Sequence, residues 1–84
     1  MHKIWAKIIT DNKVKRSIIY DAGERIESWN FFNHVRQIAE QLKIQTPIVL
    51  NSYAEHFINV NLVKFKQRDF LEEINFDCLW LEKI

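Results

Sequence analysis

The fold is decided by residues 4–20, IWAKIITDNKVKRSIIY. Side chains in this stretch alternate between two sides of an extended chain, first over residues 4–9 and again from Val14 to Tyr20, which is typical of strands. Between the two runs lies Asp11-Asn12-Lys13, and asparagine tolerates the left-handed backbone that tight hairpin loops need. We therefore predict a β-hairpin with a three-residue loop, in which the cross-strand pairs are Ala6 with Ile18, Ile4 with Tyr20, and Thr10 with Val14.

A helix is predicted after the hairpin. Gly23 can take positive φ at no cost, so residues 21–24 are expected to form a turn. Apolar residues then recur at three- and four-residue spacing, at Phe31, Phe32, Val35, Ile38, Ala39 and Leu42. Ser28 is the expected N-cap of this helix. Trp29 falls outside the apolar stripe.

The second half of the chain holds shorter elements. Pro47 precedes a short apolar strand or extended segment over residues 48–50, and Ser52 with Glu55 has the spacing of a capping box for a helix over residues 53–58. A half-exposed strand is expected over residues 62–66, with Val63 and Phe65 on one side, and a single helical turn over residues 68–73. The last predicted strand, residues 76–84, is apolar on both faces, so it is central in the sheet or lies under a partner.

These elements predict one α+β domain over residues 1–84, with a small mixed sheet built from an N-terminal hairpin, one main helix, a short helix and two C-terminal strands. A β-grasp-like arrangement would suit this order, with the last strand parallel beside the first. One helix covers only one face of such a sheet. The other face must be covered by loops, by another subunit, or left open.

Four short segments resemble a known group of proteins. They are Ile4-Trp5-Ala6-Lys7, Asp11-Asn12-Lys13, Thr46-Pro47 before an apolar run, and Phe76-Asp77 at the start of the last strand. Together they are similar to a set of short uncharacterised proteins of similar length from anaerobic Gram-positive bacteria. The resemblance covers nearly the whole chain and implies no activity, because none is assigned to that group.

Length and composition exclude several classes of protein. The chain has 84 residues, 48% of them hydrophobic, which is enough for one self-folding domain and too core-rich for a disordered segment. The lone Cys78 excludes an internal disulfide, and a single glycine excludes phosphate-binding loops and dinucleotide fingerprints. No apolar run is long enough to span a membrane, and neither a signal-peptide core nor a glycosylation acceptor is found. We therefore expect a soluble cytoplasmic protein that does not engage a membrane.

The side chains that could carry catalysis or metal binding have simpler interpretations. Cys78 with His34 or His56 could form a nucleophile and base, but cysteine in an apolar strand is usually a small buried hydrophobe. The two histidines are expected on the polar sides of their helices, and with His2 they lack the close spacing of metal ligands. Five acidic residues without a neighbouring Lys or Arg, between positions 69 and 82, are expected in a solvated turn. We predict no enzymatic activity, no cofactor and no metal.

The basic N-terminal hairpin supports a nucleic-acid hypothesis. Residues 1–20 contain five basic residues against one aspartate. Phosphates and bases could be contacted by Lys3, Trp5, Lys7, Lys15 and Arg16, and the site could extend to Lys64, Lys66 and Arg68 if their segment lies nearby. The net charge of only +1 and pI of about 7.9 argue against a dedicated nucleic-acid binder, and lysines on strands also prevent aggregation.

Protein association is the function that uses most of these features. A positive hairpin, a negative C-terminal segment and three tryptophans in 84 residues favour a charged, aromatic interface. We predict that the protein acts as a homodimer or as an accessory subunit of another protein. The predicted interface residues are Trp5, Trp29 and Trp80.

Overall fold

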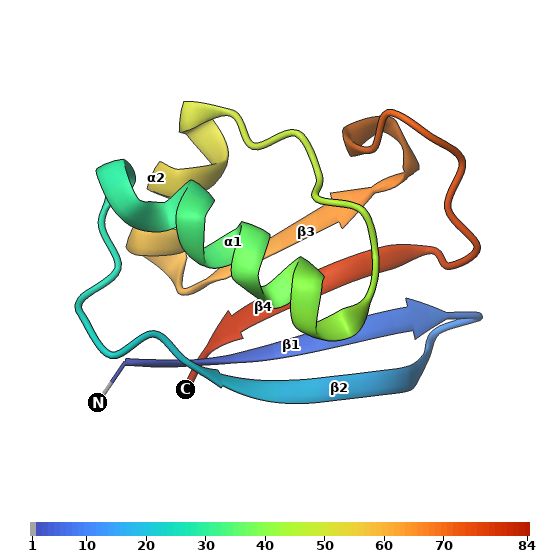
Figure 1. Ribbon diagram of the computed structural model, residues 1–84, viewed down its shortest axis with the longest axis horizontal. Helices are drawn as coiled ribbons and strands as arrows, with labels where there is room; N and C mark the ends of the chain where they lie inside the picture. Colours follow the sequence, from blue (N-terminus) through green and yellow to red (C-terminus); the bar gives the residue numbers. More distant parts are fainter. Residues whose placement is uncertain (1) are drawn as a thin grey trace.

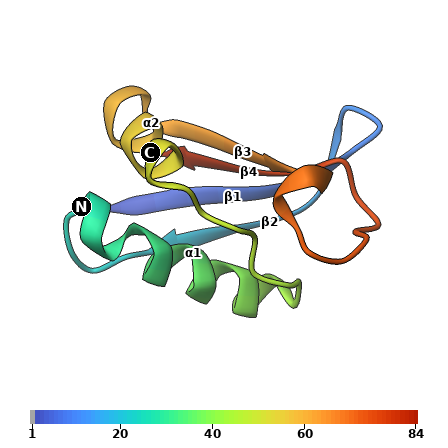
Figure 2. The same cartoon turned by 90° about the horizontal axis from the view of Figure 1, so that it is seen from above.

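The computed structural model describes residues 2–84, which form a four-stranded sheet with two helices. In chain order the elements are β1 (Lys3–Thr10), β2 (Lys13–Asp21), α1 (Ser28–Leu42), α2 (Asn51–Val60), β3 (Leu62–Lys66), the 3₁₀ turn η1 (Gln67–Asp69) and β4 (Cys78–Lys83). Both helices lie on the same side of the sheet (Figures 1 and 2). The predicted α+β architecture is confirmed.

The strand order is β2-β1-β4-β3, and all three neighbouring pairs are antiparallel. The doubly apolar last strand is central, as its sequence indicates, and it lies beside β1. Its expected parallel direction is wrong. β4 runs opposite to both β1 and β3, so the two chain ends lie together at one end of the central strands, where the Ile84 amide donates to the Lys3 carbonyl at 3.1 Å (Figure 1).

The hairpin has a shorter loop than the sequence predicts. Asp11 and Asn12 both have positive φ, 54° and 63°, and form a two-residue loop in which Thr10 pairs with Lys13 and not with Val14. A bulge then leaves Lys15 without a cross-strand partner, which shifts the register by one residue. This shift restores the predicted pairs of Ile4 with Tyr20 and Ala6 with Ile18.

The core lies between the sheet and the two helices. Fully or nearly buried side chains from all four strands and both helices form it: Ile4, Ala6, Ile8, Tyr20, Phe31, Val35, Ile38, Leu42, Ala54, Phe57, Val63, Phe65, Leu79 and Leu81. Phe31 of α1 packs against Phe57 of α2 with ring centroids 5.2 Å apart, and this contact joins the helices. The helical stripe is as predicted except for Phe32, which is 52% exposed.

The helix starts differ from their predicted caps. Glu27 is the N-cap of α1, because the side chain of Asn30 returns to accept a hydrogen bond from its amide at 2.8 Å, and Ser28 is the first helical residue. The N-cap of α2 is Leu50, so the expected Ser52–Glu55 capping box does not form. Residues 48–50 are not a strand, and the single turn falls at residues 67–69.

No helix within residues 2–84 has the length and apolar character required to cross a bilayer.

Candidate functional site: the open face of the sheet

One face of the sheet carries no helix. Alternation along the strands and the pairing register place twelve residues on it in three rows across β2, β1, β4 and β3. We call this surface the open face; its rows are Ile19-Trp5-Glu82-Leu62, Ser17-Lys7-Trp80-Lys64 and Val14-Ile9-Cys78-Lys66. Seven of the twelve are apolar or aromatic, and Val14 and Ile19 are 50% and 56% exposed.

The centre of the open face is a buried lysine. Lys7 is only 7% exposed, and its Nζ lies 4.0 Å from the ring centroid of Trp5 and 4.4 Å from that of Trp80. The Nζ also donates to Glu82 Oε1 at 3.1 Å. Lys64 Nζ lies 4.1 Å from the Trp80 ring. Tryptophan and lysine side chains therefore interleave across the central strands, held by cation–π contacts.

The lysines of the open face differ in whether a ligand could reach their ammonium groups. The ammonium of Lys7 is enclosed by two indole rings and paired with a carboxylate, so it organises the face and does not reach a ligand. Lys64 and Lys66, on the edge strand β3, are exposed and carry the free positive charge. The indole Nε1 of Trp80 is buried and has no hydrogen-bond partner within residues 2–84.

Cys78 lies at one end of the open face and is 9% exposed. Burial raises the pKa of its thiol, with the negative charge of Asp77 acting in the same direction and Lys64 and Lys66 opposing it. A thiol held protonated in this way is a poor nucleophile. The structure thus agrees with the interpretation of Cys78 as a buried hydrophobe.

The predicted interface tryptophans divide into two groups. Trp5 and Trp80 meet on the open face through Lys7, whereas Trp29 lies on α1, 76% exposed, in the helical layer on the other side of the sheet. One flat interface cannot contain all three.

The predicted nucleic-acid residues are also separated. Lys3, Trp5 and Lys7 project from the same side of β1, but Lys15 lies in the bulge. Arg16 extends from the opposite side and donates through Nη2 to the Leu42 carbonyl at 2.5 Å, where it caps the end of α1. The hairpin alone therefore presents no continuous basic surface, and β3 supplies the exposed lysines next to Trp80.

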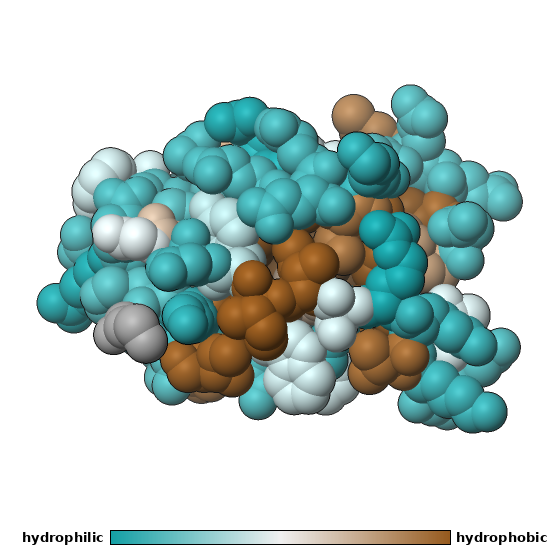
Figure 3. Space-filling view, turned by 60° about the horizontal axis from the view of Figure 1, so that its bottom comes forward, coloured by the Kyte–Doolittle hydropathy of each residue, from teal (hydrophilic) through white to brown (hydrophobic). Residues whose placement is uncertain are grey.

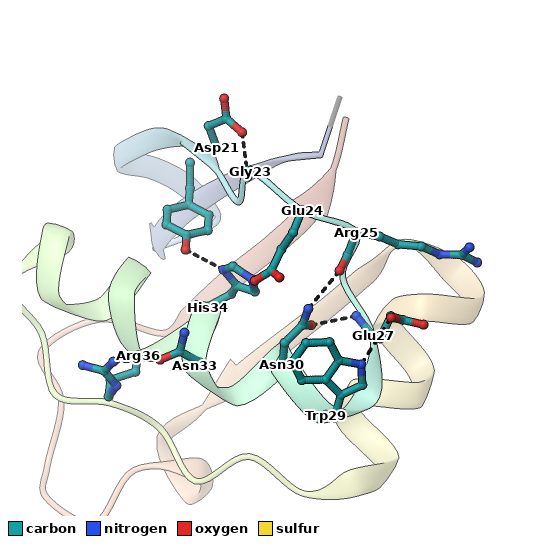
Figure 4. Close-up of polar contacts among 11 residues, drawn as sticks. Asp21, Gly23, Glu24, Arg25, Glu27, Trp29, Asn30, Asn33, His34 and Arg36 are labelled. Atoms are coloured by element: carbon teal, nitrogen blue, oxygen red, sulfur yellow. Dashed lines mark hydrogen bonds and ion pairs between the residues drawn. The ribbon is translucent and has the colours of Figure 1, made fainter.

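His34 is buried and hydrogen-bonded, and the expectation of a solvated polar flank is wrong. It is 2% exposed, its Nδ1 lies 2.6 Å from the Tyr20 hydroxyl, and its Nε2 lies 2.7 Å from Glu24 Oε2 (Figure 4). A neutral imidazole satisfies both contacts when Nε2–H donates to the carboxylate and the hydroxyl donates to Nδ1. The chain joins β2, the following turn and α1.

This Tyr20–His34–Glu24 chain is structural in character. Burial, followed by the negative charge of Glu24, raises the pKa of the Tyr20 phenol. The tyrosine and the histidine are both enclosed in the core, and neither lines the groove between α2 and β3 or the groove formed by residues 43–45 and 73–76. His56, in contrast, is exposed on α2 as predicted. Within residues 2–84, no three His, Cys, Asp or Glu side chains are grouped so as to hold a metal ion.

A groove adjoins the open face at its β3 edge. It has a volume of about 530 Å³ and is lined by Ser52, Tyr53 and His56 of α2 and by Leu62, Val63, Lys64, Lys66 and Arg68. Lys64 and Lys66 belong to both surfaces. Seen from below the orientation of Figure 1, apolar side chains reach the surface in an oblique band between polar ones (Figure 3).

Comparisons with known protein families, curated proteins and solved structures find no match to this chain.

Proposed function

We propose that this protein is a non-enzymatic binding module that associates with another protein through the open face. The observation that carries the proposal is a sheet face without helices on which Trp5, Ile19 and Val14 remain accessible. Exposed apolar and aromatic side chains that gather on one face, with polar side chains beside them, are typical of interaction sites in soluble proteins. Tryptophan supplies large, rigid contact area in such sites.

The size of the face limits the interaction. Four strands about 4.8 Å apart and five residues at about 3.3 Å each give a footprint of roughly 320 Å². A standard interface buries about 800 Å² on each partner. The open face alone therefore supports only a weak complex, and a stable partner must also contact the surface beyond one edge of the sheet.

Charge favours a different protein over a second copy. The open face carries Lys7, Lys64 and Lys66 against Glu82, a net charge of +2. Two such faces packed about 10 Å apart repel each other by about 1.7 kcal/mol in water before salt screening, which weakens a dimer by a factor of about 16. An acidic partner surface gains from the same field. We therefore favour the role of accessory subunit over that of homodimer.

The site chemistry supports a role without catalysis. The thiol is buried with a raised pKa, and the one histidine held by hydrogen bonds is enclosed in the core. A single unpaired cysteine suits a reducing compartment, so we place the module in the cytoplasm.

Single-stranded nucleic acid is the second candidate. Trp5 and Trp80 stand on the two central strands, and Lys64 is exposed beside Trp80, so bases could stack while a phosphate is neutralised. Stacking on Trp80 requires Lys64 to leave the ring. This candidate predicts a steep loss of affinity with added salt.

Two variants with matched exposure test the proposal. Ile19→Asp alters the open face at a residue 56% exposed, and Phe32→Asp alters the helical layer at one 52% exposed. In affinity capture from native extract, we expect a stoichiometric protein partner with the wild-type chain and with Phe32→Asp, but not with Ile19→Asp, and no effect of nuclease. Equal capture by both variants, or a partner released by nuclease, would overturn the proposal.

A further inference from the structure

The groove beside β3 is basic. Three of its lining side chains, Lys64, Lys66 and Arg68, are exposed cations, and His56 faces the same space. No acidic residue lines it. Asp69, in the turn that follows β3, is 6% exposed, and its carboxylate accepts hydrogen bonds from the Lys66 amide and the Tyr53 hydroxyl. Leu62, Val63 and the Tyr53 ring add apolar surface, so the groove suits an anionic ligand that also has apolar groups.

The backbone of β3 faces this groove with unpaired groups. The Lys83 amide bonds to the Asn61 carbonyl, so the hydrogen-bonded pairs with β4 continue at Val63 and Phe65. The backbone groups of Leu62 and Lys64 therefore point away from β4. The Lys66 amide, which follows the same alternation, points outward to Asp69 Oδ2 at 2.8 Å. An edge with unpaired N–H and C=O groups is a template for another strand.

The start of α2 adds to the positive field. Its N-cap, Leu50, provides no side-chain hydrogen bond, and Ser52 of the first turn lines the groove. Amides in an uncapped first turn carry partial positive charge.

We propose that the groove receives an extended acidic segment of the partner protein, which pairs with the edge of β3. The inference rests on the proposed function and extends the contact past the open face. A peptide backbone matches the unpaired groups at Leu62 and Lys64, which a nucleic acid backbone does not. Acidic side chains two residues apart on the added strand would lie beside Lys64 and Lys66, because these lysines share one face.

The probe is a fluorescein-labelled peptide of alternating glutamate and valine, tested by anisotropy and amide chemical shifts on the full chain. Two further peptides serve as controls: one has lysine in place of glutamate, and one has alternate amides N-methylated. The double variant Lys64→Glu with Arg68→Glu is compared with Lys13→Glu and Lys15→Glu on β2, an equal charge change at the other edge. Amide spectra establish that each variant is folded.

We expect the acidic peptide to shift the amides of residues 62–68 and 52–56, with affinity about tenfold weaker in the β3 variant and unchanged in the β2 variant. Binding should be lost when the N-methylated amides of the peptide are those that would donate to the carbonyl groups of β3. Equal weakening in both variants, equal binding of the lysine peptide, or stronger binding of an oligothymidylate at the same amides would overturn the inference. If Ile19→Asp abolishes capture of the partner while the β3 variant retains it in full, the inference fails and the proposed function stands. If the β3 variant abolishes capture while Ile19→Asp retains it in full, the open face is not the binding surface.

Discussion

Removal of the Tyr20 hydroxyl should destabilise the protein by leaving His34 Nδ1 unpaired. The hydroxyl and Nδ1 are 2.6 Å apart, and the two residues are 4% and 2% exposed, so water cannot replace the bond. A buried polar atom without a partner costs about 1–3 kcal/mol. Tyr20→Phe changes nothing else in the core.

The expected change is large enough to measure by thermal unfolding. An unfolding entropy of about 2.1 cal/mol/K per residue gives roughly 0.18 kcal/mol/K for 84 residues. The melting temperature of Tyr20→Phe should therefore fall by about 6–17 °C, followed by circular dichroism at neutral pH.

A double-mutant cycle isolates the bond. In a His34→Leu background the hydroxyl has already lost its partner, so adding Tyr20→Phe should cost nothing or stabilise the protein. If Tyr20→Phe lowers the free energy of unfolding equally in both backgrounds, or by less than about 0.5 kcal/mol in the wild-type chain, the bond between Tyr20 and His34 does not stabilise the fold as reasoned.

Three further outcomes are expected. Lys7→Met should change the free energy of unfolding, measured by urea titration, by less than about 1.5 kcal/mol, because an apolar side chain of similar length replaces the stem and a buried charge is removed. Lys7→Ala should lower the free energy of unfolding further, and equal losses in the two variants would contradict this reasoning. Cys78 should react with iodoacetamide at pH 8 far more slowly in the native state than in guanidinium chloride. Burial raises the pKa of Tyr20 and Cys78, and a bond to Asp69 raises that of Tyr53. These groups are neutral below their pKa, so their contribution to stability is complete below about pH 8.5 and is lost as the pH rises through their pKa values in the folded protein. The free energy of unfolding should therefore fall in alkali, and a free energy of unfolding that stays constant up to about pH 11 would contradict this.

The periodicity of apolar residues was sufficient to predict the helices and strands but not the relative directions of the strands. Alternation predicts strands over residues 62–66 and 76–84, where the structure has strands over 62–66 and 78–83, and the two apolar faces of the last strand place it centrally. The same alternation occurs in parallel and antiparallel strands, so the direction of β4 relative to β1 could not be predicted. The loop length failed for a similar reason, since a two-residue loop with a bulge gives the same pairs at Ala6 and Ile4 as a three-residue loop without one.

Two buried polar side chains were misplaced because residue type was given more weight than position. His34 lies three residues after Phe31 and four before Ile38, which places it on the apolar stripe. Its burial depends on Tyr20 and Glu24, which are distant in sequence. Lys7 is buried because Trp80, on β4, closes over it together with Trp5. Contacts across strands of this kind are not visible before the strand order is known.

The central claim is that the open face contacts a protein partner, and site-specific photo-crosslinking in living cells tests it most directly. A photoreactive residue is placed at Ser17, exposed on the open face, or at Asn33, exposed on α1. We expect a discrete protein adduct from position 17 and none from position 33. Adducts from position 33 alone, or none from position 17 at the same expression level, would contradict the account.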